Sequence, residues 1–169
     1  DVRDTYGYTA EVLNLGGGFG VRYVESDPQI DIASCIQKLS VHVKTKCAEH
    51  NLPALDILME PGRSIVADAG ITIYSVGGTK TINGYKNYVS VDGGMTDNPR
   101  YALYGSAYTL MLANRANEPA DYLCTVAGRC CESGALIQEN ILLPKPVSGD
   151  LLAVFVTGAY NHSMSSNYN

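Results

Sequence analysis

The stretch Glu60-Pro61-Gly62-Arg63 follows an apolar run at 55–59 whose pattern indicates a short buried strand. Pro61 and Gly62 break regular structure after that strand and leave the two flanking charged side chains exposed. Because ligands bind at the C-terminal ends of strands in parallel α/β proteins, the carboxylate and the guanidinium stand where a ligand would bind. The planar fork of arginine suits a phosphate or a carboxylate. A simple ion pair that closes a turn explains the four residues equally well.

An earlier strand, expected at 12–15, runs directly into the glycine loop Gly16-Gly17-Gly18-Phe19-Gly20. Between the two strands, apolar residues recur every three or four positions over 28–50, which predicts a surface helix with Asp27 as its N-cap. One helical turn is expected at 64–68. The order strand, helix, strand predicts parallel strands joined by a right-handed crossover.

The glycine loop offers consecutive backbone N–H groups with no side chains in the way, an arrangement that can hold a phosphate. A dinucleotide-binding fingerprint would need a glycine where Val21 stands, and the residues around Lys80 depart from a nucleotide-binding P-loop because a threonine intervenes. For the loop alone, the alternative interpretation as a glycine-rich turn that binds no ligand stays open. Together with Arg63, one strand-helix unit later, the loop favours a phosphate site.

In the second half, β-branched and aromatic runs are separated by Gly, Asn and Asp, which predicts a mostly antiparallel β region. We therefore expect one domain at 1–69 and a second at 70–169. Tight turns are expected at Gly77-Gly78 and at Asn83-Gly84, the latter as a type I′ hairpin. Residues 104–112 fit either a strand or a helix. The runs expected to form strands are 71–76, 88–91, 122–126 and 151–156.

Composition argues against several classes of protein. The net charge is −5 and the twelve Lys and Arg residues are scattered, which disfavours a nucleic-acid-binding surface. No apolar run approaches the roughly 18 residues that span a bilayer, and the N-terminal residues lack a signal pattern. The five cysteines form no CxxC pair and are odd in number, so we expect reduced thiols, no metal site and a cytoplasmic location. Both ends are expected to be cut, because the first residue is not methionine and the last follows a polar run.

Three further motifs carry reactive or charged groups. A thiol beside a carboxylate, in Cys130-Cys131-Glu132-Ser133-Gly134, can donate a proton, although a buried structural cysteine is the commoner case. Asp97-Asn98-Pro99-Arg100 places an arginine on a loop beside Tyr101 and Tyr104, and Gly158-Ala159-Tyr160-Asn161 places a tyrosine at a strand end. A solvated arginine and a packed tyrosine are the plain alternatives for these two motifs.

Taken in order, the motifs resemble those of the diaminopimelate decarboxylases over essentially the whole chain. This family uses pyridoxal 5′-phosphate (PLP) and belongs to the alanine-racemase-like group, with an N-terminal TIM barrel and a C-terminal β domain. The resemblance implies that 1–69 are the last βα units of the barrel and that 70–169 are an antiparallel β domain cut short at its end. The matching stretches are Gly-Gly-Gly-Phe-Gly at 16–20, Glu-Pro-Gly-Arg at 60–63, Asp-Asn-Pro-Arg at 97–100 with Tyr104, Cys-Glu-Ser-Gly at 131–134 and Gly-Ala-Tyr at 158–160.

The resemblance also implies a role for each motif. The glycine loop would hold the cofactor phosphate, Glu60 would keep the pyridine nitrogen protonated, and Arg100 with Tyr104 would bind the distal carboxylate and amino group of the substrate. Cys131 would donate a proton to the carbanion left when CO₂ departs. Cys131 and Glu132 would reach into the site of a partner subunit, so a homodimer with shared sites is implied. The implied cofactor-binding residues are Gly16, Gly17, Gly18, Glu60, Gly62, Arg63 and Tyr160, and the implied substrate-binding residues are Arg63, Arg100, Tyr104, Glu132 and Tyr160.

Two features depart from the family pattern. The Schiff-base lysine of the family lies in an early motif that is absent here, since the six lysines lie on the predicted helix, beside hairpins or between prolines. Ala135 stands where the family usually has Asp after Cys-Glu-Ser-Gly. We therefore expect a cytosolic parent enzyme that converts meso-diaminopimelate to L-lysine, and a chain that is inactive by itself.

Two alternatives stay open. The parent could be a sister decarboxylase of a polyamine precursor such as carboxynorspermidine, which substrate competition would distinguish. The chain could instead be a non-catalytic β module that mediates dimerisation and retains the motif residues. Alanine at Arg100 separates the two classes, because a module would keep its dimer affinity whereas an enzyme would lose substrate binding.

Overall fold

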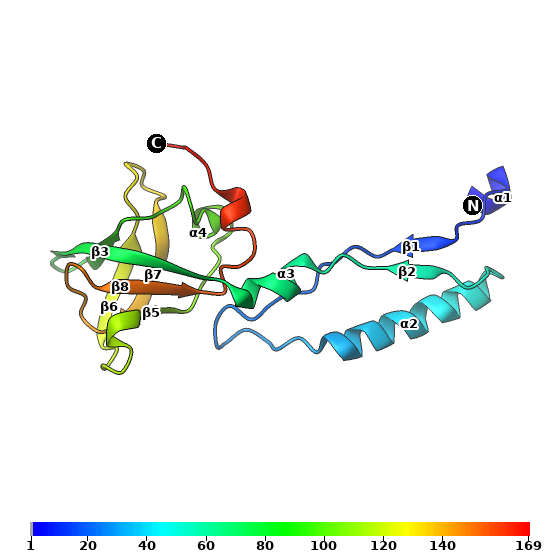
Figure 1. Ribbon diagram of the computed structural model, residues 1–169, viewed down its shortest axis with the longest axis horizontal. Helices are drawn as coiled ribbons and strands as arrows, with labels where there is room; N and C mark the ends of the chain where they lie inside the picture. The colour runs from blue at the N-terminus through cyan, green and yellow to red at the C-terminus, as the bar shows by residue number, and fades with distance from the viewer. Residues whose placement is uncertain (1) are drawn as a thin grey trace.

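The chain folds into two parts that follow one another along its length (Figure 1). In the computed structural model, which describes residues 2–169, a strand-helix-strand unit occupies one end and a six-stranded sheet the other. We call the first part the βα unit and the second the sheet. The βα unit comprises α1 (Val2–Tyr6), β1 (Val12–Asn14), α2 (Ile32–Glu49) and β2 (Asp56–Leu58), and α3 (Gly62–Val66) with η1 (Ala67–Ala69) leads from it into the sheet.

The βα unit has the predicted parallel order, because β1 pairs with β2 in parallel from Val12 opposite Asp56 to Asn14 opposite Leu58. The predicted helix cap is wrong. The N-cap is Asp31, whose side chain accepts a hydrogen bond from Ser34 N at 3.0 Å. Asp27 instead closes the preceding turn by accepting from the backbone N–H groups of Tyr23 and Val24. The helix begins five residues after Asp27, so the carboxylate of Asp27 is too far from the first turn to cap it.

The expected burial of the strand before Glu60 is also wrong. Every residue of β2 is exposed, including Ile57 at 38% and Leu58 at 53%. Within residues 2–169, β1 is the one strand that pairs with β2, and α2 lies beside the pair (Figure 1). A strand of a parallel sheet becomes buried when further strands flank it and helices cover both faces. The apolar sequence of β2 therefore fits a larger sheet than this pair.

The sheet has the strand order β5-β8-β3-β4-β6-β7 and confirms the mostly antiparallel prediction. The exception is β4 and β6, which pair in parallel with Tyr88 opposite Thr125. The largest fully buried side chains include Tyr108, Leu112, Ile137, Leu143 and Leu152, and they fill its interior. The elements of this part are β3 (Ile71–Ile82), β4 (Lys86–Val91), α4 (Arg100–Tyr104), β5 (Leu110–Leu112), η2 (Ala113–Arg115), β6 (Tyr122–Ala127), β7 (Leu136–Leu143), β8 (Leu151–Phe155) and η3 (His162–Met164).

Local turn signals in this part were only partly predictive. Gly77-Gly78 is not a turn, because β3 continues through it and the register shifts between Val76 and Gly78, as in a β-bulge. Asn83-Gly84 does close a hairpin between β3 and β4, but only Gly84 has a positive φ (+74°), whereas a type I′ turn needs two. Residues 104–112 contain the end of α4, a loop and β5. Strand β7 was missed because Gln138-Glu139-Asn140 interrupts its apolar pattern.

Two glycines join the βα unit to the sheet. Gly158 N donates a hydrogen bond to Ala67 O at 3.0 Å, and Thr157 N donates to Gly70 O at 2.9 Å. A Cβ on Gly158 would lie 1.8 Å from Val66 O, and one on Gly70 would lie 2.4 Å from the Cα of Gly158. The backbones therefore approach more closely here than any side chain allows.

Gly158→Ala is expected to lower the free energy of unfolding by about 1–3 kcal/mol, because the added methyl meets backbone atoms that cannot rotate away. Urea unfolding measures the loss. Gly78→Ala is the matched control, since a Cβ there meets no atom within 4 Å, and we expect a change within about 0.5 kcal/mol. Equal effects of the two substitutions would contradict the close approach at Gly158.

Candidate functional site

The glycine loop and Glu60 lie together at one edge of the βα unit. Because β1 and β2 are parallel, their C-terminal ends meet, and Glu60 N donates to Gly16 O at 2.7 Å. Gly16 and Gly18 have left-handed φ values of +67° and +79°, which favour glycine. A Cβ on Gly17 would lie 2.3 Å from Glu60 O, so this position also needs glycine. The loop sequence is thus explained by its backbone conformation and by its contact with Glu60.

Asn14, which sequence reasoning missed, connects these two features. Its Nδ2 donates to Glu60 Oε1 at 2.6 Å, and its Oδ1 accepts from Gly16 N at 2.7 Å. A polar residue inside the apolar run at 12–15 was the available signal. Gly16 N–H is engaged, whereas the N–H groups of Gly17, Gly18, Phe19 and Gly20 have no hydrogen-bond acceptor within the part of the chain that the structure describes. An anion at this loop would therefore meet free N–H groups, including those of Gly17 and Gly18.

Arg63 and Arg100, from different parts of the fold, meet at one tyrosine. The Cζ of Arg63 lies 5.0 Å from the ring centroid of Tyr160, and that of Arg100 lies 5.3 Å from the same centroid. Tyr160 has a φ of +69°, a conformation that costs a non-glycine residue roughly 1–2 kcal/mol. Arg63 forms no ion pair with Glu60, so the plain turn-closing interpretation of the Glu-Pro-Gly-Arg stretch does not hold.

Arg100 is a buried cation without a counter-charge. It is 7% exposed, and no carboxylate of residues 2–169 forms an ion pair with it. Its Nη2 donates to Ser106 Oγ at 3.4 Å, while its Nε has no partner. The rings of Tyr104 and Tyr23 lie 5.5 and 5.6 Å from its Cζ, so three aromatic faces surround the guanidinium. Burying an unpaired charge is costly, which points to an anionic ligand at this position.

Three further buried polar groups, from residues 98, 108 and 161, were missed from the sequence, and that of residue 108 lies near Arg100. The side chains of Asn98 and Asn161 are almost fully buried and make no hydrogen bond, and neither does the hydroxyl of Tyr108. Burial raises the pKa of Tyr108, and the neighbouring charge of Arg100 opposes that rise. Asn98 lies two residues before Arg100, and Asn161 directly follows Tyr160 in the sequence. Their presence in two of the motifs was a signal that could have identified them as site residues. This interior can accept additional hydrogen-bonding groups.

Cys131 and Glu132 lie on an exposed loop apart from these contacts. Glu132 Oε1 accepts from Gly134 N at 3.3 Å, and Oε2 accepts from the hydroxyl of Tyr168 at 3.3 Å. Neither Cys131 nor Glu132 contacts Arg63, Arg100 or Tyr160 through a hydrogen bond, an ion pair or a ring contact. By contrast, burial raises the pKa of the Cys124 thiol to about 11, which makes that thiol a poor proton donor. Of these two cysteines, Cys131 has the thiol that solvent and a ligand can reach.

Ala135, the departure from the family pattern, is buried at 3% and braces this loop. Its N–H donates to Glu132 O at 3.0 Å, and its carbonyl accepts from Gly128 N at 2.6 Å. Both hydrogen bonds use backbone atoms, so the small side chain does not disturb the turn that carries Glu132.

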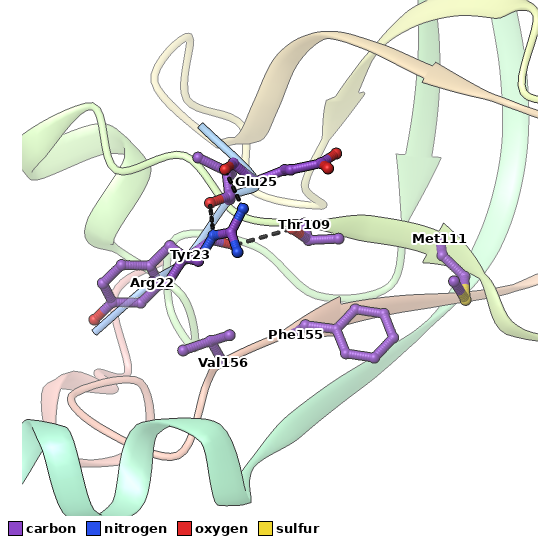
Figure 2. A pocket seen from close by; sticks show the side chains of 8 residues that line it. Arg22, Tyr23, Glu25, Thr109, Met111, Phe155 and Val156 are labelled. Carbon is purple, nitrogen blue, oxygen red and sulfur yellow. Dashed lines mark hydrogen bonds between the residues drawn. The ribbon is translucent and has the colours of Figure 1, made fainter. Parts of the chain in front are cut away.

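A cavity beside Tyr23 does not include Glu60, Arg63 or Arg100 in its lining. The cavity has a volume of about 540 Å³ and lies between the segment 22–25 and the ends of β5 and β8 (Figure 2). The guanidinium of Arg22 is turned back onto the carbonyls of Val24 and Glu25, and Met111 and Phe155 supply an apolar wall. Tyr23 is shared between this wall and the aromatic surroundings of Arg100. Arg22 and Glu25 are the two charged residues that line this cavity.

No cluster of metal-ligating side chains occurs within residues 2–169. None of the helices described there is both long and apolar enough to cross a membrane.

Comparison with known proteins assigns the chain to a class first. The family described as pyridoxal-dependent decarboxylase, C-terminal sheet domain, matches residues 8–158. The chain belongs to this family, which confirms the predicted fold: an α/β segment followed by the β domain of a PLP-dependent decarboxylase.

Relatives within that class include diaminopimelate decarboxylases, as the motifs predicted. The chain is 48% identical to diaminopimelate decarboxylase of Bacillus subtilis over 99% of its own length and 38% of that relative. The crystal structure of the Helicobacter pylori diaminopimelate decarboxylase complexed with L-lysine matches with a TM-score of 0.83 and 32% identity, over 99% of this chain and 39% of that one. The lysine/ornithine decarboxylase of Vibrio vulnificus complexed with cadaverine matches with a TM-score of 0.83 and 26% identity, over 99% and 44%. The chain thus spans less than half the length of these proteins.

Proposed function

We propose that this chain is the C-terminal part of a PLP-dependent decarboxylase that converts meso-2,6-diaminopimelate to L-lysine. The observation that carries the proposal is the buried, unpaired guanidinium of Arg100 beside Tyr160 and Arg63. A substrate with a carboxylate at its far end would supply the missing negative charge through a charge-assisted hydrogen bond. The exposed ring of Tyr104 would border the same end of the substrate.

The residues of the βα unit fit the two ends of PLP. When bound, PLP supplies an electron sink for the carbanion left by decarboxylation. The amides of Gly17 and Gly18 would donate to its phosphate, with Gly16 and Gly62 shaping the loops on either side and Arg63 adding positive charge. Glu60 Oε2 makes no hydrogen bond among the described residues, so it would hold the proton of the pyridine nitrogen. Tyr160 would contact both cofactor and substrate.

The proton that completes the reaction would come from Cys131. When the bond between the α-carbon and its carboxylate breaks, CO₂ leaves and the electron pair stays on the α-carbon, where the thiol proton would form the new C–H bond. Because Cys131 and Glu132 are exposed and lie apart from Arg100, they are proposed to serve the site of a partner subunit. A homodimer with shared sites satisfies this arrangement.

Three further assignments belong to the proposal. The Schiff-base lysine is placed outside these 169 residues, so the chain alone would be inactive; Lys86, for example, is paired with Glu139 in the sheet. The domain boundary is placed at 69–70, where η1 passes into β3. A cytoplasmic location is proposed because all five cysteines are free thiols.

The charge of Arg100 also helps to distinguish the proposed function from a decarboxylase of diamine precursors and from a dimerisation module. Ornithine and lysine carry an ammonium group at the far end, which a buried guanidinium would repel. A decarboxylase of such diamine precursors would therefore pair this arginine with a carboxylate of its own. The dimerisation-module alternative gives no reason to bury an unpaired cation.

The test is substrate competition on the holoenzyme that contains this chain. We expect CO₂ release from meso-diaminopimelate, with a kcat/KM at least tenfold above those for carboxynorspermidine, L-ornithine and L-lysine. A higher value for any of the other three would overturn the assigned substrate. No CO₂ release from any of the four would favour the non-catalytic module.

A further inference from the structure

One side chain outside all the predicted motifs joins the two halves of the proposed cofactor site. The amide of Asn14 lies between the glycine loop, which follows β1, and Glu60, which follows β2. Its two hydrogen bonds, 2.6 Å to Glu60 Oε1 and 2.7 Å from Gly16 N, use both ends of the amide. The orientation of the amide is unambiguous, because the backbone N–H can only donate and the carboxylate accepts.

Within residues 2–169, Asn14 supplies the one hydrogen bond to the carboxylate of Glu60. Glu60 is otherwise an exposed side chain at a strand end, where a glutamate has considerable rotamer freedom. The bond to Oε1 removes that freedom and leaves Oε2 available. The same side-chain amide accepts a hydrogen bond from Gly16 N. Asn14 therefore fixes the distance between the carboxylate of Glu60 and the backbone amides of the glycine loop.

We propose that Asn14 is a positioning residue for the cofactor: it orients Glu60 toward the pyridine nitrogen and sets its spacing from the phosphate-binding amides of Gly17 and Gly18. This inference rests on the proposed function, because it needs PLP at this edge. Asn14 would keep the group that binds the pyridine ring and the groups that bind the phosphate at the spacing of the two ends of PLP.

The substitution that isolates this role is Asn14→Asp. It keeps the size of the side chain and an acceptor for Gly16 N, but it removes the donor to Glu60 and places a second carboxylate against it. Asn14→Ala removes both hydrogen bonds without adding charge. The matched control is Asn87→Asp, because Asn87 Nδ2 also donates one hydrogen bond, to Leu123 O at 3.0 Å, at a place in the sheet outside the cofactor site.

PLP affinity is measured by fluorescence titration of the apo form of the enzyme that contains this chain, together with the absorption spectrum against pH and the Tm of each variant. We expect Asn14→Asp and Asn14→Ala to weaken PLP binding by roughly ten- to a hundredfold, as loss of supporting residues does at metal sites, and to change the pH dependence of the spectrum. Asn87→Asp should match wild type. The Tm identifies any variant that fails to fold.

The outcomes separate the two proposals. If wild type takes up no PLP, the proposed function fails. If wild type binds PLP, and folded Asn14→Asp and Asn14→Ala bind it with unchanged affinity and spectrum, the positioning role of Asn14 is wrong and the proposed function stands. A fall in Tm with an unchanged spectrum would reduce Asn14 to a structural residue and would also overturn the inference.

Discussion

Arg100→Ala is expected to lower kcat/KM for meso-diaminopimelate about 30-fold to several thousandfold, which corresponds to roughly 2–5 kcal/mol. The reason is that Arg100 is buried at 7% exposure without a carboxylate partner, so the substrate would complete its charge pair. Steady-state kinetics of the holoenzyme measure the effect. Dimer affinity should not change, which distinguishes a substrate-binding arginine from part of a dimerisation module.

Arg100→Met tests whether the loss reflects substrate binding rather than folding. Replacing a buried charge by an apolar side chain of similar length is often neutral or stabilising, so the Tm should stay the same or rise while activity is lost. Arg3→Ala, on α1 at the far end of the βα unit, is the matched arginine control and should keep full activity (Figure 1). Wild-type kinetics for Arg100→Met would remove the basis of the proposed substrate.

Asp150→Ala is expected to lower the free energy of unfolding by about 3–5 kcal/mol. Asp150 is 3% exposed and accepts hydrogen bonds from Val147 N at 2.9 Å, Asn114 Nδ2 at 2.9 Å and Arg115 Nη1 at 3.0 Å. Its removal leaves Val147 N and Asn114 Nδ2 without this acceptor in the turn that leads into β8, whereas Arg115 Nη1 keeps its hydrogen bond to Lys145 O at 2.9 Å. Urea unfolding measures the loss. Asp121→Ala, at an exposed position, is the control and should change stability by less than about 0.5 kcal/mol.

The same carboxylate gives a pH dependence with a defined sign. Burial raises the pKa of Asp150, but the hydrogen bonds from Val147, Asn114 and Arg115 outweigh burial, so the folded-state pKa lies below its usual value. The contribution of Asp150 to the free energy of unfolding is therefore complete above the unfolded-state pKa of about 4. It is lost as the pH falls through the folded-state pKa. Wild type should lose stability more steeply than Asp150→Ala below about pH 4. If the free energy of unfolding changed with pH in the same way for wild type and Asp150→Ala, the ionised carboxylate would not be stabilised by its hydrogen bonds.

The elements that were predicted correctly depend on short-range patterns. The parallel strands around 12–15 and 55–59, the helix between them and most strands of the sheet follow from apolar periodicity. The errors arose where neighbours in space outweigh local signals. Asp27 has the right chemistry for a cap but lies too far from the helix start, and Gly77-Gly78 stays extended because β3 pairs with β4 and β8 around it.

The family, the order of the elements and the motif residues could be read from the sequence, because they depend on residue type and on spacing along the chain. Which of these residues contact one another depends on the tertiary fold. Arg63 and Arg100 share the ring of Tyr160 because Gly70 and Gly158 let two backbones touch, and Asn14 reaches Glu60 because β1 and β2 lie side by side. Local propensity acts over a few residues, whereas these contacts join segments far apart in the chain. Their geometry is set by the packing of whole elements, which no short stretch of sequence encodes.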